Sequence, residues 1–156
     1  MLAMDLDATE LLVEKSAIAE TIYKYCFFFD RNQPDKLVEL FTHDAEVDYG
    51  PEVPPLIGQE KIFEMVSKGL RETFLATSHH VSNVLVTIST PERAFSTSYV
   101  YAWHQYRNKS EIGHLWGGYD HEFKKVGGVW LIHRLKLFGV GIEDFHRTKM
   151  HSNGRN

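Results

Sequence analysis

The first third of the chain has the hydrophobic spacing of amphipathic helices. Apolar residues at helical spacing predict a helix from about Thr9 to Phe29, with one stripe formed by Ile18, Ile22, Tyr25 and Phe29. Three residues are suitable N-caps for this helix: Asp7, Thr9 and Ser16. The turns around the stripe are also aromatic, so we expect the helix to be covered on most of its sides.

Two shorter helices and a strand are predicted to follow. Pro34 suits the first position of a helix, and the polar pair His43 and Asp44 is expected to end it. In chain order we predict a helix over 35–42, a strand over 45–49, a proline-rich loop over 50–55 and a helix over 58–74.

From residue 79 onward the hydrophobic period changes to the two-residue period of β-strands. Four strands are predicted, over 79–88, 94–106, 112–125 and 128–140. The pair Gly117 and Gly118 inside the third of them indicates a bulge or a sharp curl. These patterns predict an α+β fold, in which a strongly curved, mixed but mostly antiparallel sheet forms a cone-shaped barrel and three N-terminal helices close a pocket.

Alternation assigns side chains to the two faces of this sheet. In strand 94–106 the small residues share a face with His104, and the opposite face carries Phe95, Tyr99, Tyr101 and Trp103. We expect the small face to be concave and to lie under the helices. An aromatic face of this size is a candidate subunit interface, so we expect a homotrimer or a homodimer.

Composition sets limits on location and partners. Of the 156 residues, 43% are hydrophobic and 24% are charged, with a net charge of −4, which fits one globular domain and disfavours nucleic acid as a partner. No apolar run reaches the roughly 18 residues of a membrane span, so no membrane partner is expected. The single cysteine, Cys26, fits a reducing compartment, and we expect the protein to be cytoplasmic. We predict a disordered N-terminus over 1–8, one domain over 9–146 and a flexible tail over 147–156.

Asp30 stands out because it ends an aromatic helix. A carboxylate that is buried without a partner costs several kcal/mol or has its pKa raised. The chain contains nine histidines, and we expect Asp30 to orient one of them inside a pocket. The alternative is a structural role, in which Asp30 caps the turn before Pro34 or pairs with Arg31 or Lys36.

Four segments, taken in order, resemble a known family: Phe29-Asp30, Val47-Asp48-Tyr49, the stretch over 77–83, and His104-Gln105-Tyr106. The pattern is similar to the SnoaL-like group of the nuclear transport factor two superfold. Within that group it most resembles scytalone dehydratase, with hexachlorocyclohexane dehydrochlorinase and bile-acid dehydratase as relatives. The resemblance covers about residues 10–145 and implies a cystatin-like fold. This superfold includes enzymes and non-enzymes, so the fold does not establish catalysis.

The resemblance implies a role for four catalytic candidates. Asp30 matches the carboxylate of the family's dyad, and His79 matches its general base. Tyr49 matches a tyrosine that helps to hold water against the substrate carbonyl, and His104 matches a second pocket histidine. His104 is equally consistent with a buried core histidine, whereas His43, His146 and His151 are expected in loops or in the tail.

Three positions depart from the pattern of scytalone dehydratase. Phe29 replaces its other water-holding tyrosine, and Gly117 and Tyr119 replace its serine and asparagine. Scytalone is therefore not the expected substrate. Tyr25 and Tyr119 are candidates for the missing hydroxyl, and the expected substrate-binding residues are Tyr25, Phe29, Asn83, Gly117 and Tyr119.

The residue types themselves fit proton transfer. A carboxylate that binds one ring nitrogen of a histidine fixes its tautomer and raises its basicity. Such a histidine can remove a proton from carbon beside a carbonyl or a leaving group, while Tyr49, His104 or Tyr25 stabilises charge on oxygen. We therefore predict a cofactor-independent, dehydratase-like lyase that acts on a small hydrophobic cyclic or aromatic substrate.

Other functions are consistent with the same residues. Isomerisation, dehydrohalogenation and aldol cleavage can use the same pair, and a non-catalytic ligand-binding or assembly module needs neither group. We expect an enzyme if Asp30 contacts His79 in a cavity of about 300 Å³ or more. A metal site made of Asp30, His79 and His104 is disfavoured because the ligands have no short spacing, so no metal is expected.

Overall fold

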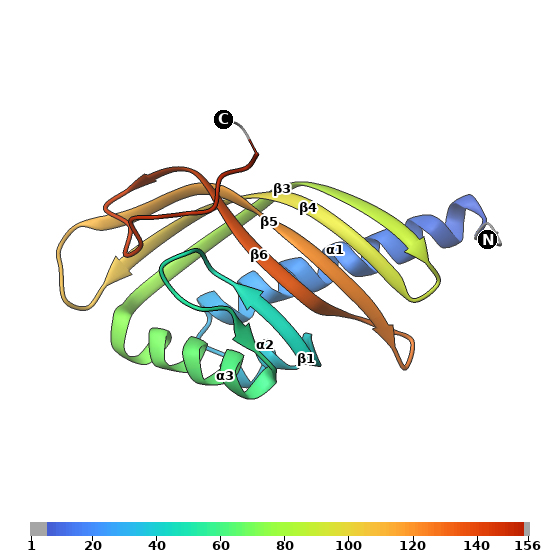
Figure 1. Cartoon of the computed structure of the whole chain (residues 1–156), viewed down its shortest axis with the longest axis horizontal. Coiled ribbons are helices and arrows are strands. Elements are labelled where there is room, and N and C mark those ends of the chain that lie inside the picture. The colour runs from blue at the N-terminus through green and yellow to red at the C-terminus, as the bar shows by residue number, and fades with distance from the viewer. Residues whose placement is uncertain (1–5, 155–156) are drawn as a thin grey trace.

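The computed structural model describes residues 6–154, which form three α-helices, a π-helical turn and one six-stranded sheet (Figure 1). The helical segments are α1 (Ala8–Asp30), α2 (Pro34–Val38), α3 (Gln59–Lys68) and the turn η1 (Gly69–Thr73). The strands are β1 (Phe41–Asp48), β2 (Leu56–Ile57), β3 (Phe74–Thr90), β4 (Arg93–Tyr106), β5 (Ile112–Val126) and β6 (Val129–Glu143). The predicted α+β class is confirmed.

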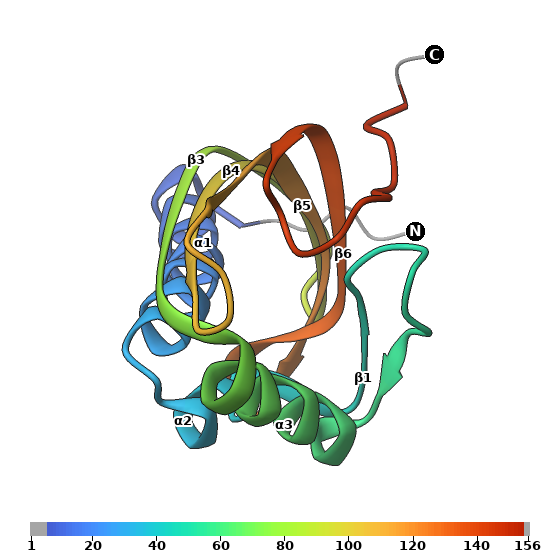
Figure 2. The ribbon, with the colours of Figure 1, turned by 90° about the vertical axis from the view of Figure 1, so that its left-hand side faces the viewer.

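The sheet is mixed, curved and open. Its strand order is β2-β1-β6-β5-β4-β3, so β2 and β3 are edges and the sheet does not close into a barrel. Strand β1 runs parallel to β6, and the other neighbouring pairs are antiparallel. Figure 2 shows the long strands arching over the interior, with α2 and α3 across the open side. Helices, not further strand pairing, therefore close the cone.

Helix α1 begins at a capping box. Asp7 accepts hydrogen bonds from the backbone N–H groups of Thr9 and Glu10, and the Glu10 carboxylate accepts one from the Asp7 backbone. Asp7 is thus the cap among the three candidates. The disorder of residues 1–8 stays a prediction; residues 1–5 lie outside the described part, and α1 begins at Ala8. The predicted stripe is buried at Ile18, Ile22, Tyr25 and Phe29.

The second helix is shorter than predicted and the next strand is longer. Helix α2 ends at Val38 and β1 starts at Phe41, so the predicted helix over 39–42 is wrong, and His43 lies in a strand. The Leu40 carbonyl accepts a hydrogen bond from Ile132 of β6 at 2.8 Å, and the Phe41 side chain is fully buried. Pairing with a strand far along the chain outweighs the local helical spacing.

The glycine pair in β5 marks the predicted irregularity. The register between β5 and β6 shifts between Trp116 and Gly117, which confirms the bulge. A Cβ atom at Gly117 would lie 2.1 Å from the Phe138 carbonyl oxygen, and one at Gly118 would lie 2.3 Å from the Ser98 carbonyl oxygen. Glycine is required here because the neighbouring backbones approach too closely for a side chain.

A second bulge, in β3, was not predicted. Asn83 has a φ of 53°, and the register to β4 shifts between Ser82 and Leu85. The shift exchanges the two faces of the strand, so Leu85 is 69% exposed while Val84 and Val86 pack against the core. Strict alternation would place Asn83 and Leu85 on the face of His79, but the bulge turns both side chains outward.

The C-terminal segment is attached to the body of the protein. Thr148 and Lys149 donate hydrogen bonds to the Glu52 carboxylate, and His151 lies 2.9 Å from both carboxylate oxygens of Asp48. The flexible tail over 147–156 stays a prediction, and its residues 155–156 lie outside the described part. The polar sequence that suggested fraying supplies these hydrogen bonds.

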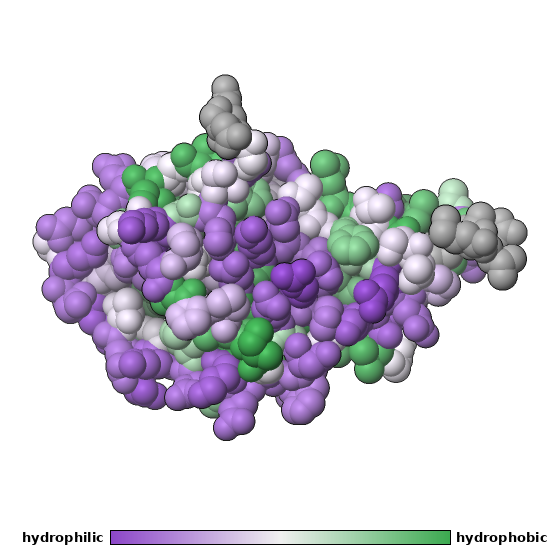
Figure 3. All heavy atoms as spheres, viewed as in Figure 1, coloured by the Kyte–Doolittle hydropathy of each residue, from purple (hydrophilic) through white to green (hydrophobic). Residues whose placement is uncertain are grey.

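The two faces of β4 are divided as predicted. The small residues and His104 point into the core, and Ser98 and Ala102 are each 1% exposed. Phe95 and Tyr99 on the opposite face are 43% and 55% exposed. The side of the molecule seen in Figure 3 is largely hydrophilic, with hydrophobic residues interspersed. Within residues 6–154, no helix has the length and apolarity needed to cross a membrane.

One core histidine is buried almost without polar partners. His121 is 2% exposed, its Nδ1 lies 3.5 Å from the Ser96 hydroxyl, and its Nε2 has no hydrogen-bond partner among the described residues. Burial lowers its pKa from 6.5 to about 3. The folded protein therefore keeps His121 neutral over a pH range in which the unfolded chain protonates it.

This difference predicts a loss of stability in mild acid. The unfolded chain binds more protons than the folded one below pH 6.5, so the free energy of unfolding falls as the pH decreases towards 3. Between pH 7 and pH 5, His121 alone should account for about 2 kcal/mol of this loss. Urea unfolding of the parent chain and of His121→Gln at both pH values measures it. An equal pH dependence in the two proteins would contradict the prediction.

Candidate active site

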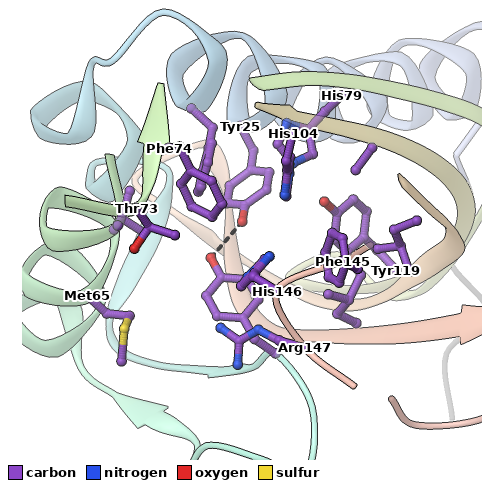
Figure 4. Close-up of a pocket in the computed structure, with 17 residues that line it drawn as sticks. Tyr25, Met65, Thr73, Phe74, His79, His104, Tyr119, Phe145, His146 and Arg147 are labelled. Atoms are coloured by element: carbon purple, nitrogen blue, oxygen red, sulfur yellow. Dashed lines mark hydrogen bonds between the residues drawn. The ribbon is translucent and has the colours of Figure 1, made fainter. Parts of the chain in front are cut away.

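An internal cavity of about 130 Å³ lies between the sheet, α1 and the C-terminal segment (Figure 4). Its wall is mostly aromatic and aliphatic, with a few polar groups that face inward. We expected an enzyme if Asp30 contacts His79 in a cavity of about 300 Å³ or more; the contact is present, but the cavity is smaller than that limit. An apolar cavity of about 150 Å³ holds a benzene-sized ring, so this cavity suits a ligand of about one ring.

Asp30, the last residue of α1, binds the start of β3. Its Oδ1 accepts hydrogen bonds from His79 Nδ1 at 2.6 Å and from the Thr77 hydroxyl at 2.8 Å. Its Oδ2 accepts a hydrogen bond from the His79 backbone N–H at 2.8 Å. The side chains of Asp30 and His79 are only 21% and 7% exposed. The end of α1 is thereby held against β3.

These hydrogen bonds define the ionisation of the pair. Burial acts to raise the pKa of Asp30, but the hydrogen bonds and charge of His79, together with the Thr77 hydroxyl, outweigh burial and lower it. The carboxylate is therefore ionised and must accept from His79 Nδ1–H. The Nε2 atom of neutral His79 then carries the lone pair.

A second histidine lies against this nitrogen. His104 Nε2 is 3.3 Å from His79 Nε2, and His104 is 4% exposed. Burial, with smaller effects from His79, His146 and Arg147, lowers the pKa of His104 to about 2, so it is neutral. In the neutral form of His79, its Nε2 accepts and His104 Nε2 donates the hydrogen. His104 Nδ1 is then a bare acceptor, and it has no partner among the described residues.

Two tyrosines form a second polar group in the wall. The hydroxyls of Tyr25 and Tyr49 are 2.6 Å apart, as the dashed line in Figure 4 marks. Burial raises the pKa of Tyr49 to about 12 and raises the pKa of Tyr25 well above its usual value, so both hydroxyls stay protonated. Two hydroxyls share one hydrogen bond, which leaves one O–H available to a ligand. The Tyr119 ring packs edge-on against Tyr25, with ring centres 6.0 Å apart.

Aromatic side chains hold the histidines in place. The Phe29 ring lies edge-on to His79, with 5.1 Å between centres, and the Phe74 ring lies 4.7 Å from that of His104. Phe145 stacks on the other side of His104 at 5.1 Å. Such a surrounding excludes water and strengthens the electrostatic interactions inside the cavity.

Most residues predicted for the site lie together. The structure brings His79, His104, Tyr25, Tyr49, Phe29 and Tyr119 into the cavity wall, and Asp30 lies directly behind His79. Two predicted substrate-binding residues do not line it. Asn83 is exposed because of the β3 bulge, and Gly117 lies where β5 and β6 approach closely.

Sequence reasoning missed one side of the cavity. Met65 and Phe74 come from the region of α3 and η1, and Phe145, His146 and Arg147 come from the segment after β6. We assigned His146 and Arg147 to loops or to the tail. Hydrophobic Phe145 beside two basic residues was the available signal, but only the path of the chain brings them to the cavity.

No group of three histidine, cysteine, aspartate or glutamate side chains within residues 6–154 is arranged to bind a metal ion. His79 Nδ1 and both oxygens of Asp30 are already used in hydrogen bonds. The arrangement thus presents one basic nitrogen, one hydroxyl donor and a largely apolar space. It is suited to proton transfer on a ligand bound without water.

Comparison with known proteins agrees with this fold and cavity. The model of the SnoaL-like domain family matches residues 10–136. A solved structure from Novosphingobium aromaticivorans, provisionally assigned as a scytalone dehydratase, is 32% identical, with a TM-score of 0.87 over 93% of this chain and 96% of that one. A search of curated proteins found no match.

More distant structures share the fold. A hexachlorocyclohexane dehydrochlorinase is 16% identical, with a TM-score of 0.79 over 92% of this chain and 97% of that one. A ketosteroid isomerase-like protein from Erwinia carotovora atroseptica is also 16% identical, with a TM-score of 0.70 over 82% of this chain and 97% of that one. At such identities these structures support the fold alone. The family model and the relative at 32% identity together show that this chain belongs to the SnoaL-like domain family.

Proposed function

We propose that this protein is a cofactor-independent, dehydratase-like lyase that acts on a small cyclic or aromatic substrate. The observation that carries the proposal is the 2.6 Å hydrogen bond between Asp30 and His79 Nδ1, in the wall of a mainly apolar cavity. A histidine held in this way presents a basic Nε2 to a ligand. The provisional assignment of the relative at 32% identity points to the same chemistry.

The proposed reaction begins with proton transfer to His79. The substrate C–H bond beside a carbonyl breaks, its proton moves to His79 Nε2, and its electron pair moves toward the carbonyl oxygen as an enolate. The C–O bond on the next carbon then breaks, the enolate pair forms the C=C bond, and the leaving hydroxyl takes the proton from His79 to depart as water. Every bond that breaks and every proton that moves is accounted for, and His79 returns to its neutral form.

The tyrosine pair is placed to assist this step. As the carbonyl oxygen gains negative charge, the O–H not used between Tyr25 and Tyr49 can donate to it. Tyr119 is a second hydroxyl donor in the same wall. Scytalone dehydratase has a water-holding tyrosine where this chain has Phe29. Here the hydroxyls of Tyr25, Tyr49 and Tyr119 take over the role of that tyrosine.

His104 positions the base, His79, and does not itself react with the substrate. Its hydrogen bond to His79 is long, at 3.3 Å, and therefore weak. A substrate C–H group can replace this hydrogen bond at little cost in free energy. Until the substrate binds, the hydrogen bond keeps the His79 lone pair directed into the cavity. Because burial lowers the pKa of His104 to about 2, it adds no charge that would repel the His79 imidazolium.

The same pair serves related reactions. If the proton returns to another carbon of the enolate, the result is isomerisation, and if the leaving group is a halide or a carbon fragment, it is dehydrohalogenation or aldol cleavage. A non-catalytic ligand-binding module is the alternative of another class. The ordered Asp30 contacts favour the enzyme, because a simple apolar binding site does not require a buried carboxylate.

We also propose that the protein is cytoplasmic and assembles as a homotrimer or homodimer. The outer face of the sheet carries Phe95, Tyr99 and Trp116, which are 43%, 55% and 46% exposed. Side chains of this type on adjoining strands form a candidate contact surface.

The first prediction concerns the proton-transfer pair. Asp30→Asn and His79→Ala should each lower turnover at least about a hundredfold, because each removes the base or its orientation. The measurement is loss of the acidic proton, by NMR in deuterated buffer, from a panel of one-ring β-hydroxy ketones. His80→Ala is the matched control, since His80 adjoins His79 but is exposed. Full activity in either variant would remove that residue from the mechanism.

The second prediction concerns assembly. Sedimentation velocity at micromolar concentration should show a dimer or a trimer, and Tyr99→Glu should shift it toward the monomer. Leu12→Glu, which changes a residue 69% exposed on α1, is the control and should leave the assembly unchanged. A monomeric parent chain would refute this surface as an interface.

A further inference from the structure

Arg147 places a cation in the wall of the cavity. It follows β6 and lines the cavity together with His146, at the side opposite to His79 (Figure 4). Its guanidinium lies over the Tyr49 ring, with 5.6 Å from Cζ to the ring centre. Neither the elimination step nor the fold described above uses this charge.

The charge of Arg147 lacks a counter-ion within ion-pair distance. Among residues 6–154, no carboxylate oxygen lies within 4.0 Å of its guanidinium nitrogens. Glu52, the acidic residue that influences it most, accepts hydrogen bonds from Thr148 and Lys149 instead. Partial burial lowers the pKa of Arg147, but a guanidinium remains charged.

A partly buried cation without a paired anion carries a desolvation cost that an anionic ligand can offset. The five N–H groups of a guanidinium match the two oxygens of a carboxylate, and such paired hydrogen bonds are strong. The cation–π contact with Tyr49 uses none of the guanidinium N–H groups, and none of them has a hydrogen-bond partner among residues 6–154, so they are free to bind a ligand. The site is therefore suited to a carboxylate at the end of the cavity near Arg147.

We propose that Arg147 selects substrates that carry a carboxylate on a single ring. This inference rests on the proposed function and adds the substrate class. The carboxylate binds Arg147, the ring occupies the apolar centre, and the carbon that loses its proton faces His79 at the opposite side. The distance between the two polar ends of the cavity fixes which carbon reacts.

The test compares charged and neutral ligands of equal shape. Benzoate and benzamide are titrated separately into the parent chain, and binding is measured by calorimetry and by NMR of the histidine ring protons. Benzoate should bind roughly ten- to a hundredfold more tightly than benzamide. In Arg147→Gln that preference should vanish, with benzamide binding unchanged, and in Arg147→Lys it should be partly retained.

Three further variants separate the explanations. Arg71→Gln removes an exposed arginine that pairs with Glu72 and should keep the preference for benzoate. Asp30→Asn should lose turnover but still prefer benzoate, so failure of the proposed function is distinguishable from failure of this inference. Phe145→Ala enlarges the cavity, so it shows whether benzoate or benzamide fails to bind only because the probe is too large.

The outcomes are decisive. If Arg147 only secures the C-terminal segment by stacking on Tyr49, Arg147→Gln will lower the melting temperature without changing the ratio of the two affinities. Equal affinity of the parent chain for benzoate and benzamide, or no binding of either at millimolar concentration in both the parent chain and Phe145→Ala, would overturn the proposal.

Discussion

The hydrogen bonds of Asp30 join helix α1 to the β-sheet at one point. The carboxylate ends α1, and its three hydrogen bonds all go to the edge strand β3, at Thr77 and His79. A carboxylate so placed is held without losing its charge, because the donors offset what burial would cost. The same contacts fix the His79 tautomer, so the interaction that attaches the helix also produces the basic nitrogen.

The rest of the cavity maintains this arrangement. Phe29, one residue before Asp30, packs against the His79 ring, and Phe74 at the start of β3 packs against His104. Each polar group has an aromatic neighbour that excludes water and limits its rotamers. The two histidine rings in the cavity wall therefore have little freedom of orientation.

The C-terminal segment completes the cavity from outside the sheet. Its hydrogen bonds to Glu52 and Asp48 hold it against the loop after β1, and Phe145 and Arg147 reach the cavity from there. A closing segment built from short polar contacts is easier to displace than a core strand. The positive charge that Arg147 brings has no part in the proton-transfer pair proposed above.

The sequence by itself determined the α+β class, the buried stripe of α1, the two faces of β4 and the pairing of Asp30 with His79. The class, the stripe and the two faces follow from local periodicity, and the rule that a carboxylate in an apolar place needs a partner predicts a histidine for Asp30. The choice of His79 among the nine histidines came from the resemblance to the SnoaL-like group. Only the tertiary structure decided the β3 bulge that turns Asn83 outward, the extension of β1 over Phe41 and Thr42, and the position of Arg147. In each case the deciding contact joins residues far apart in the chain, and no local spacing encodes it.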